Sequence, residues 1–277
     1  MALPQLGCED VIAVSTPGEE PRLVIDALIR VHENEAQTLV RVQATLTASF
    51  FETIPTTGLT DITIANLGTG DPYDSSGFEV LTEQPEGSGI YEKLVATDFL
   101  TSGELVLQLT HEGRLYYAST RYVKSVPVDN LEQGDQTFFD KNDTEVIVSF
   151  TDTPDVDNYY LFDFNFGEYL VTEDTFYKGQ SFSFSYFYDD ALDPGQRVDI
   201  HLLGADLGFY NYMNELILQT QEDFGPFDTP AATVRGNIFD VTDLDNMEVL
   251  DNVDQPDKFA LGYFAVVEEY SATLTIE

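Results

Sequence analysis

Apolar and polar residues alternate along several short stretches of this chain, and this period of two constrains its fold more than any other feature. From Val40 to Leu46 every second residue is apolar, and from Ser181 to Tyr186 serines alternate with aromatic residues. Successive side chains of a β-strand point to opposite faces of a sheet, so this pattern is typical of a strand with one buried face. The chain is therefore predicted to be mainly β.

The strand candidates form two groups. They run through residues 22–124 and 136–277, and many are short and divided by Gly, Pro, Asp and Ser clusters, as in sandwich folds. Ser125–Asp135 between them is mostly polar and shows no periodicity, so we interpret it as a linker. We expect two β-sandwich (Ig-like) domains, preceded by an acidic tether within residues 1–21.

One segment departs from the β pattern. Between residues 206 and 221, apolar side chains recur at helical spacing, and Asp206 stands where an N-cap is expected. These apolar side chains are Phe209, Tyr210, Met213, Leu216 and Ile217. The second domain is therefore predicted to carry one packed amphipathic helix. A hairpin is predicted where residues 105–110 lead through His111, Glu112 and Gly113 into residues 115–123.

The charge of the chain excludes several classes of partner. Fifty acidic residues against 12 lysines and arginines give a formal net charge of −38. Such a surface repels phosphate backbones and anionic lipid headgroups, so we expect no nucleic-acid binding and no basic membrane patch. Three explanations of the acidity stay open: a saline (halophilic) habitat, local binding of divalent cations, and general solubility.

Calcium is the one candidate cofactor. Ca²⁺ takes six to eight oxygen ligands from flexible loops, and three acidic loops offer oxygens: residues 140–143, 152–157 and 243–257. The candidate ligands come from the last two and are Asp152, Asp155, Asp157, Asp243, Asp245 and Asp251. None of the loops has the spacing of an EF-hand, and solvated acidic loops are the alternative interpretation.

Nothing in the sequence indicates catalysis. The three histidines do not form a metal-binding pair, and we expect His111 and His201 to be solvated surface residues. No nucleophile elbow, phosphate-binding loop or dinucleotide motif occurs. With fifty acids, no carboxylate pair can be singled out as that of a hydrolase. We therefore expect a protein that is not an enzyme.

Aromatic residues supply the binding candidates. The alternating rings of residues 182–188 are expected in a sandwich core, with a sugar-stacking platform as the alternative. Phe224, Pro226 and Phe227 form a Pro/Gly-rich turn whose rings are not needed for packing, so we predict a contact surface there. Tyr263, in a Gly-Tyr-Phe strand near the C-terminus, is the fourth candidate.

A single cysteine, Cys8, rules out an intrachain disulfide. It follows a glycine and precedes two acids, which suggests the acylated first residue of a mature lipoprotein; an incidental exposed cysteine is the alternative. No apolar run is long enough to span a bilayer, so membrane contact is expected through a lipid anchor only.

Several segments together resemble a family of Bacteroidota lipoproteins, the domain-of-unknown-function 4249 family. They are Cys8–Ile12, Pro21–Asp26, Gly225–Phe227, Val234–Ile238 and Ala260–Phe264. The family has these motifs in the same order, and the resemblance spans nearly the whole chain. Acids directly after the cysteine also resemble a surface-export signal of that phylum, whereas the strong acidity departs from the family.

The resemblance implies an outer-membrane lipoprotein, lipid-anchored and exposed on the cell surface. It also implies a link to a TonB-dependent transporter, because genes of the family often stand beside such transporters. We therefore expect an accessory or ligand-binding partner of a transporter. The alternative is a structural or adhesive cell-surface module that binds protein or polysaccharide. An enzyme with paired carboxylates is a third and weaker hypothesis.

Overall fold

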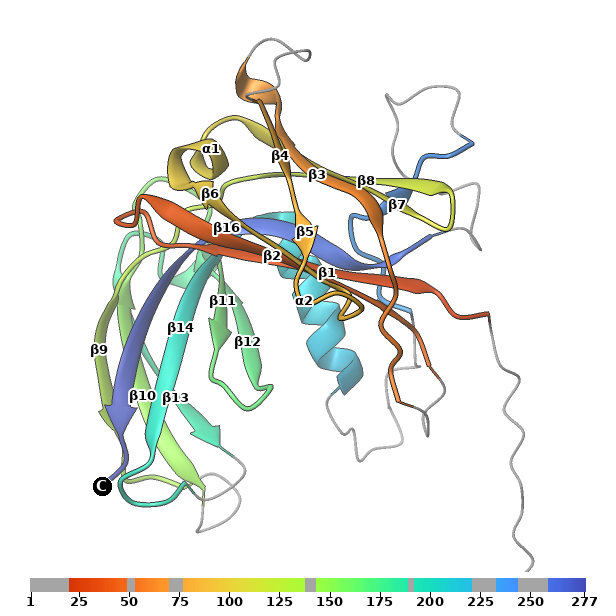
Figure 1. Cartoon of the computed structure of the whole chain (residues 1–277). Coiled ribbons are helices and arrows are strands. Elements are labelled where there is room, and N and C mark those ends of the chain that lie inside the picture. The colour runs from red at the N-terminus through yellow and green to blue at the C-terminus, as the bar shows by residue number, and fades with distance from the viewer. Residues whose placement is uncertain are drawn as a thin grey trace, which may run out of the picture.

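The computed structural model describes residues 20–48, 53–69, 77–137, 143–188, 192–220, 233–243 and 259–277. Within these ranges the chain forms three β-sheets and two α-helices, so the prediction of a mainly β fold is confirmed (Figure 1). The helices are α1 (Thr97–Thr101) and α2 (Leu207–Thr220).

The largest sheet has eight strands drawn from both halves of the chain. In spatial order they are β12 (Tyr169–Glu173), β11 (Tyr159–Asp163), β14 (Arg197–Ala205), β16 (Leu261–Thr275), β1 (Leu23–Val31), β2 (Gln37–Leu46), β6 (Ile90–Ala96) and β5 (Thr82–Glu83). The five-stranded sheet consists of β15 (Phe239–Asp240), β8 (Arg114–Arg121), β7 (Glu104–His111), β3 (Thr60–Asn66) and β4 (Phe78–Val80). The three-stranded sheet consists of β13 (Ser181–Tyr188), β10 (Thr144–Thr151) and β9 (Val128–Gln133).

The two smaller sheets cover the same face of the large sheet, each over one half of it. The five-stranded sheet packs on β1, β2, β6 and the start of β16, and the buried side chains between them form the first core. The three-stranded sheet packs on β11, β14 and the end of β16 and encloses the second core. Phe264 of β16 lies in the first core and Leu274 packs against the second, so even-numbered residues of this strand face both.

The long strand β16 joins the two halves by changing partners along its length. Its first part pairs in parallel with β1, up to Val31 opposite Glu268, and its second part pairs with β14, beginning at Leu203 opposite Glu269. The first strand of the predicted N-terminal domain thus lies next to the last strand of the chain. The expected boundary near residue 125 is not where the sheets divide.

The predicted linker is wrong over part of its length, because residues 128–133 form β9. This strand pairs with β10, and its apolar residues Val128 and Leu131 pack against the second core. Its pairing shifts register between Ser149 and Phe150 of β10, which leaves an extra residue on β9 and breaks the alternation. The period of two is therefore lost from the sequence although the strand is present.

The predicted helix and hairpin are both confirmed. Asp206 caps α2, because the backbone N–H of Phe209 donates to its Oδ1 at 2.7 Å. The hairpin joins β7 to β8 through Glu112 and Gly113, which both have positive φ, as a two-residue type I′ turn requires. Helix α2 packs on the face of the eight-stranded sheet opposite the two cores, where Phe209 and Met213 bury against Leu161 and Ala265.

Candidate functional site

A cavity of about 490 Å³ lies between α2 and the eight-stranded sheet. Strand β1 lines it with Asp26, Leu28 and Arg30, and α2 contributes Tyr212 and Leu216. Further walls come from β11, β12 and β16. Most of these side chains are apolar or aromatic and only two are charged, which is the usual makeup of a small-molecule site.

Tyr263, predicted from sequence as a binding residue, lies in this cavity. Its ring centroid is 4.9 Å from that of Tyr212 and 5.2 Å from that of Phe209, so it joins β16 to the helix. Gly208 leaves room for its hydroxyl, since a Cβ at that position would lie 2.8 Å from the Tyr263 oxygen. The tyrosine is therefore a fixed part of the cavity wall.

Two neighbours of Tyr263 explain how the backbone places it. Gly262 has φ near +97°, and a Cβ there would lie 1.8 Å from the carbonyl oxygen of Ile25, so only glycine lets β16 approach β1 this closely. The side chain of Asn237 accepts from the N–H of Phe264 at 2.8 Å and donates to its carbonyl at 2.9 Å. The Gly-Asn-Ile and Gly-Tyr-Phe motifs thus serve backbone geometry here.

The hydroxyls around the cavity stay protonated at neutral pH. Burial raises the pKa of Tyr212 and of Tyr169, and the negative charge of Asp26 raises both further. Burial also raises the pKa of Tyr263, with a contribution from Asp206. These hydroxyls are therefore neutral groups that can donate or accept hydrogen bonds, not nucleophiles or bases.

A row of charged side chains crosses four adjacent strands at one end of the cavity. Arg30 on β1 donates to Asp163 on β11 at 2.6 Å and to Glu269 on β16 at 3.2 Å. The Nδ1 atom of His201 on β14 lies 2.8 Å from Glu269 Oε1. The two carboxylates are buried, so both depend on these partners. This cluster holds the strands together through charge-assisted hydrogen bonds.

The expectation that His201 is a solvated surface residue is wrong. The alternation on β14 does direct His201 away from the second core, to the opposite face of the sheet. On that face its ring contacts Glu269 of β16. The hydrogen bond to Glu269 raises the pKa of His201 although burial opposes it. Burial alone would raise the pKa of Glu269, yet His201 and Arg30 lower it below its ordinary value.

The sequence contained a signal for part of this site. Asp26 and Arg30 are the charged members of the otherwise apolar stretch Leu23–Val31, and four residues apart on a strand they share a face. That signal indicates a polar feature on the second face of a buried strand. Their partners come from β11, β14 and β16, which no local pattern identifies.

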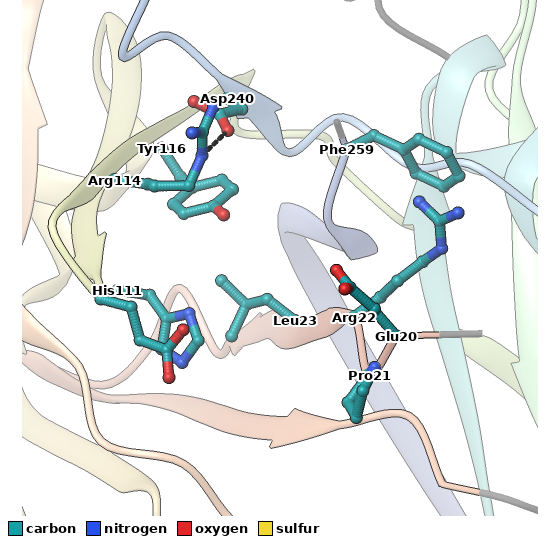
Figure 2. A pocket seen from close by; sticks show the side chains of 10 residues that line it. Glu20, Pro21, Arg22, Leu23, His111, Arg114, Tyr116, Asp240 and Phe259 are labelled. Atoms are coloured by element: carbon teal, nitrogen blue, oxygen red, sulfur yellow. Dashed lines mark hydrogen bonds and ion pairs between the residues drawn. The ribbon is translucent and has the colours of Figure 1, made fainter. Parts of the chain in front are cut away.

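A second cavity, of about 370 Å³, lies between the start of β1 and the open end of the first sandwich (Figure 2). Arg114 projects into it and its Nε is paired with the buried carboxylate of Asp240. His111, the register partner of Arg114 across the β7–β8 hairpin, lies on the same side of the cavity in Figure 2, and its Nε2 is 2.9 Å from Thr57 Oγ1. His111 is only 7% exposed, so the prediction that it is solvated is also wrong, because it ends β7 before the turn begins.

The predicted calcium ligands that the structure describes do not converge. Asp152 is buried and accepts from the hydroxyl of Tyr160 at 2.6 Å and from the N–H of Gly179 at 2.7 Å. Asp157 is paired with Lys178, and Asp155 is exposed in a turn with positive φ. Across the described ranges, no three acidic, histidine or cysteine side chains gather closely enough to hold a metal.

The remaining predicted site residues fall in two groups. Asp243 is exposed, and Arg114 Nη2 lies 3.4 Å from its Oδ2 at the rim of the second cavity. Outside the described residues lie Cys8, Phe224, Pro226, Phe227, Asp245 and Asp251. The lipidation site, the aromatic turn and the second acidic loop therefore stay predictions.

Comparison with known proteins places the chain in one family. A family model described as a domain of unknown function, DUF4249, matches residues 9–273, and no curated protein matches the chain. Within the part that the structure describes, no helix is both long and apolar enough to cross a membrane. Since the match covers nearly the whole sequence, the chain belongs to the DUF4249 family.

Proposed function

We propose that this protein is a non-catalytic outer-membrane lipoprotein, exposed on the cell surface, that serves a TonB-dependent transporter as an accessory or ligand-binding partner. The observation that carries the binding role is the aromatic cavity under α2, which is of small-molecule size and has a rigid wall around Tyr263. The transporter link rests on the family resemblance.

The state of the charged groups favours binding over catalysis. Glu269 and Asp163, the buried carboxylates next to the cavity, are both held by Arg30, and Glu269 also by His201. A general acid or base needs a pKa near the working pH, but these partners lower the pKa of Glu269. The cluster therefore acts as a structural clamp behind a binding cavity.

The anchoring role is assigned to Cys8. The family match begins at residue 9, directly after this cysteine, and the described β structure begins at Leu23. The intervening acidic and proline-containing residues provide a tether between a lipid anchor and the folded part. Two or more acyl chains hold a protein at a membrane without a spanning helix.

Purification of the native protein from its membrane in mild detergent tests this function. We expect mass spectrometry to show an acylated Cys8 and a TonB-dependent transporter to co-purify with it. A Cys8→Ser variant is the matched control and is expected to leave the membrane fraction. Recovery of the acylated protein alone, with no transporter, would overturn the proposal.

A structural or adhesive role is the second candidate. An exposed apolar patch at the edge of the five-stranded sheet favours it. Leu67 and Phe78 are 50% and 40% exposed and line a cavity of about 310 Å³, and Val80 of the same edge strand as Phe78 is 54% exposed. A glycan array probed with the wild type and with Phe78→Ser separates the two functions. Binding that depends on Phe78, without any transporter in the complex, supports the adhesive role.

A further inference from the structure

One carboxylate lies beside the aromatic wall of the cavity under α2. Asp26 of β1 is paired in register with Tyr263 of β16, and register partners of parallel strands project from the same face of a sheet. Tyr212 on the helix and Tyr169 on β12 line the same cavity as Asp26. The carboxylate therefore stands among three tyrosines from three different elements.

The two charged residues of the cavity differ in their partners. Arg30 is bound by Asp163 at 2.6 Å and by Glu269 at 3.2 Å, so its charge is already compensated. Asp26 is exposed and lines the cavity, and within the described part of the chain it has neither a hydrogen-bond donor nor a cation. The cavity thus presents one carboxylate, Asp26, without a partner among the described residues and one guanidinium, Arg30, whose charge is already compensated.

This difference discriminates between classes of ligand. An anionic ligand would have to displace Asp163 or Glu269 from Arg30, which would leave a buried carboxylate uncompensated. A neutral apolar ligand would remove water from the Asp26 carboxylate without supplying a hydrogen bond or an opposite charge. A cationic ligand meets Asp26 directly and also meets the negative faces of the tyrosine rings.

We propose that the cavity under α2 binds a small organic ammonium ion with an apolar body. This inference rests on the proposed ligand-binding function and names the class of its ligand. The ammonium group lies between Asp26 and the rings of Tyr212 and Tyr263. The apolar body packs against Leu28, Leu161 and Leu216, which line the same cavity.

The binding energy divides between the two ends of such a ligand. An ammonium group near a carboxylate and over aromatic faces gains charge-assisted hydrogen bonds and cation–π attraction. The apolar body gains by leaving water for the aliphatic wall. A cation without an apolar body is therefore expected to bind weakly, which separates this site from general attraction to an acidic surface.

Titration calorimetry on the full chain, in physiological salt, tests the proposal with three probes of one shape. They are 2-phenylethylammonium, 2-phenylethanol and phenylacetate, with methylammonium as the cation that lacks a body. We expect one equivalent of 2-phenylethylammonium to bind at least about tenfold more tightly than the alcohol, and phenylacetate to bind most weakly.

Two substitutions and a matched control locate the site. Asp26→Asn is expected to weaken 2-phenylethylammonium by about tenfold or more and to leave the alcohol unchanged. Tyr212→Leu keeps an apolar side chain but removes the ring, with an expected loss of about threefold to tenfold. Asp98→Asn removes the same charge from an exposed position on α1 and is expected to leave binding unchanged.

Several results would overturn the inference. Equal binding of all three probes, or binding of the ammonium ion that survives Asp26→Asn, would show that charge does not select the ligand. In those cases the cavity still binds ligands and the proposed function stands. Binding of none of the probes also rejects the ammonium ligand, whereas co-purification with a transporter decides the proposed function by itself.

Discussion

The two cores, which lie against the first and the last part of β16 on the same face of the large sheet, are filled with different side chains. The first is mainly aliphatic, with Ile25, Ile29 and Val42 fully buried. The second is built from rings, and Phe150 alone lies within 6.0 Å, centroid to centroid, of four others. Aliphatic packing is non-directional, whereas ring pairs prefer particular tilts, so the second core has a more specific geometry.

The two cores also differ in the partners of their buried tyrosine hydroxyls, each of which requires one. In the first core the hydroxyl of Tyr91 donates to the backbone carbonyl of Leu59 at 3.2 Å, whereas the second core also uses a carboxylate. Asp152 accepts from Tyr160, and the carbonyl of Phe164 accepts from Tyr188 at 2.8 Å. The comparison therefore explains why an acid that sequence suggested as a calcium ligand is buried: in this structure it satisfies a tyrosine of the core.

The largest effect is expected from deleting a ring of the second core. Phe162 is fully buried and has three ring partners, so Phe162→Ala should lower the free energy of unfolding by about 3–5 kcal/mol. Chemical denaturation measures the loss. Phe176→Ala is the matched control, because this phenylalanine is 91% exposed, and it should change stability by less than about 0.5 kcal/mol. Equal losses for both variants would contradict the packing described for this core.

The charged row at the junction tests whether the two halves depend on each other. Arg30→Met leaves Asp163 and Glu269 without their shared cation, and we expect a loss of about 2 kcal/mol, reduced because the arginine is partly exposed. The two halves should then unfold less cooperatively in a calorimetric scan.

The control for the junction is Arg41→Met. Arg41 makes a looser ion pair with Glu92, at 3.6 Å, on a more exposed part of the same sheet. Surface pairs of this kind contribute little, so a change within about 0.5 kcal/mol is expected. If the Arg30 and Arg41 variants lose the same stability, the charged row does not join the halves.

The sequence predicted the elements of this fold better than their arrangement. Alternation in residues 181–188 and helical spacing after Asp206 are local signals, and β13 and α2 stand where these signals put them. The parallel pairing of Leu23–Val31 with the end of the chain has no local signal, because it depends on residues more than two hundred positions apart. A division into consecutive domains was therefore the natural but incomplete expectation.

The candidate site was predicted only in part. Tyr263 was identified, but its role followed from a motif and not from the cavity that it lines. His201 was misjudged because alternation tells which face a residue occupies and not whether a second layer covers that face. Here the charged row lies on that face, and Glu269 is the partner that alternation cannot reveal.

One substitution made in both cores isolates the contribution of ring contacts. Phe162 and Phe264 are both fully buried, but within the described residues Phe264 has no ring partner. Phe162→Leu should therefore lower the free energy of unfolding by about 1 kcal/mol more than Phe264→Leu. The two substitutions remove nearly the same buried apolar area, so the difference measures the ring contacts. Equal costs in denaturation experiments would mean that ring geometry adds nothing to the second core.

The smallest expected effect is a pH dependence that comes from His201. The hydrogen bond to Glu269 raises its pKa above the ordinary 6.5, against the opposing effect of burial, and the neighbouring Arg30 also opposes it whereas Asp163 supports it. The folded state therefore binds the proton more tightly than the unfolded state. This stabilisation is fully present below about pH 6.5 and is lost as pH rises through the higher folded pKa.

Glutamine in place of His201 removes the titration and keeps a hydrogen-bond donor near Glu269. In the wild type, the free energy of unfolding should fall over the pH range just above 6.5, and in His201→Gln that fall should be absent. The same substitution should also weaken the acid limb, because His201 is one of the groups that lower the pKa of Glu269, whose stabilisation disappears as pH falls below about 4.5. The part of that limb that comes from Arg30 should remain. Identical slopes of the unfolding free energy above pH 6.5 in both proteins would mean that another group titrates there. His201 would then not stabilise the junction between the two cores.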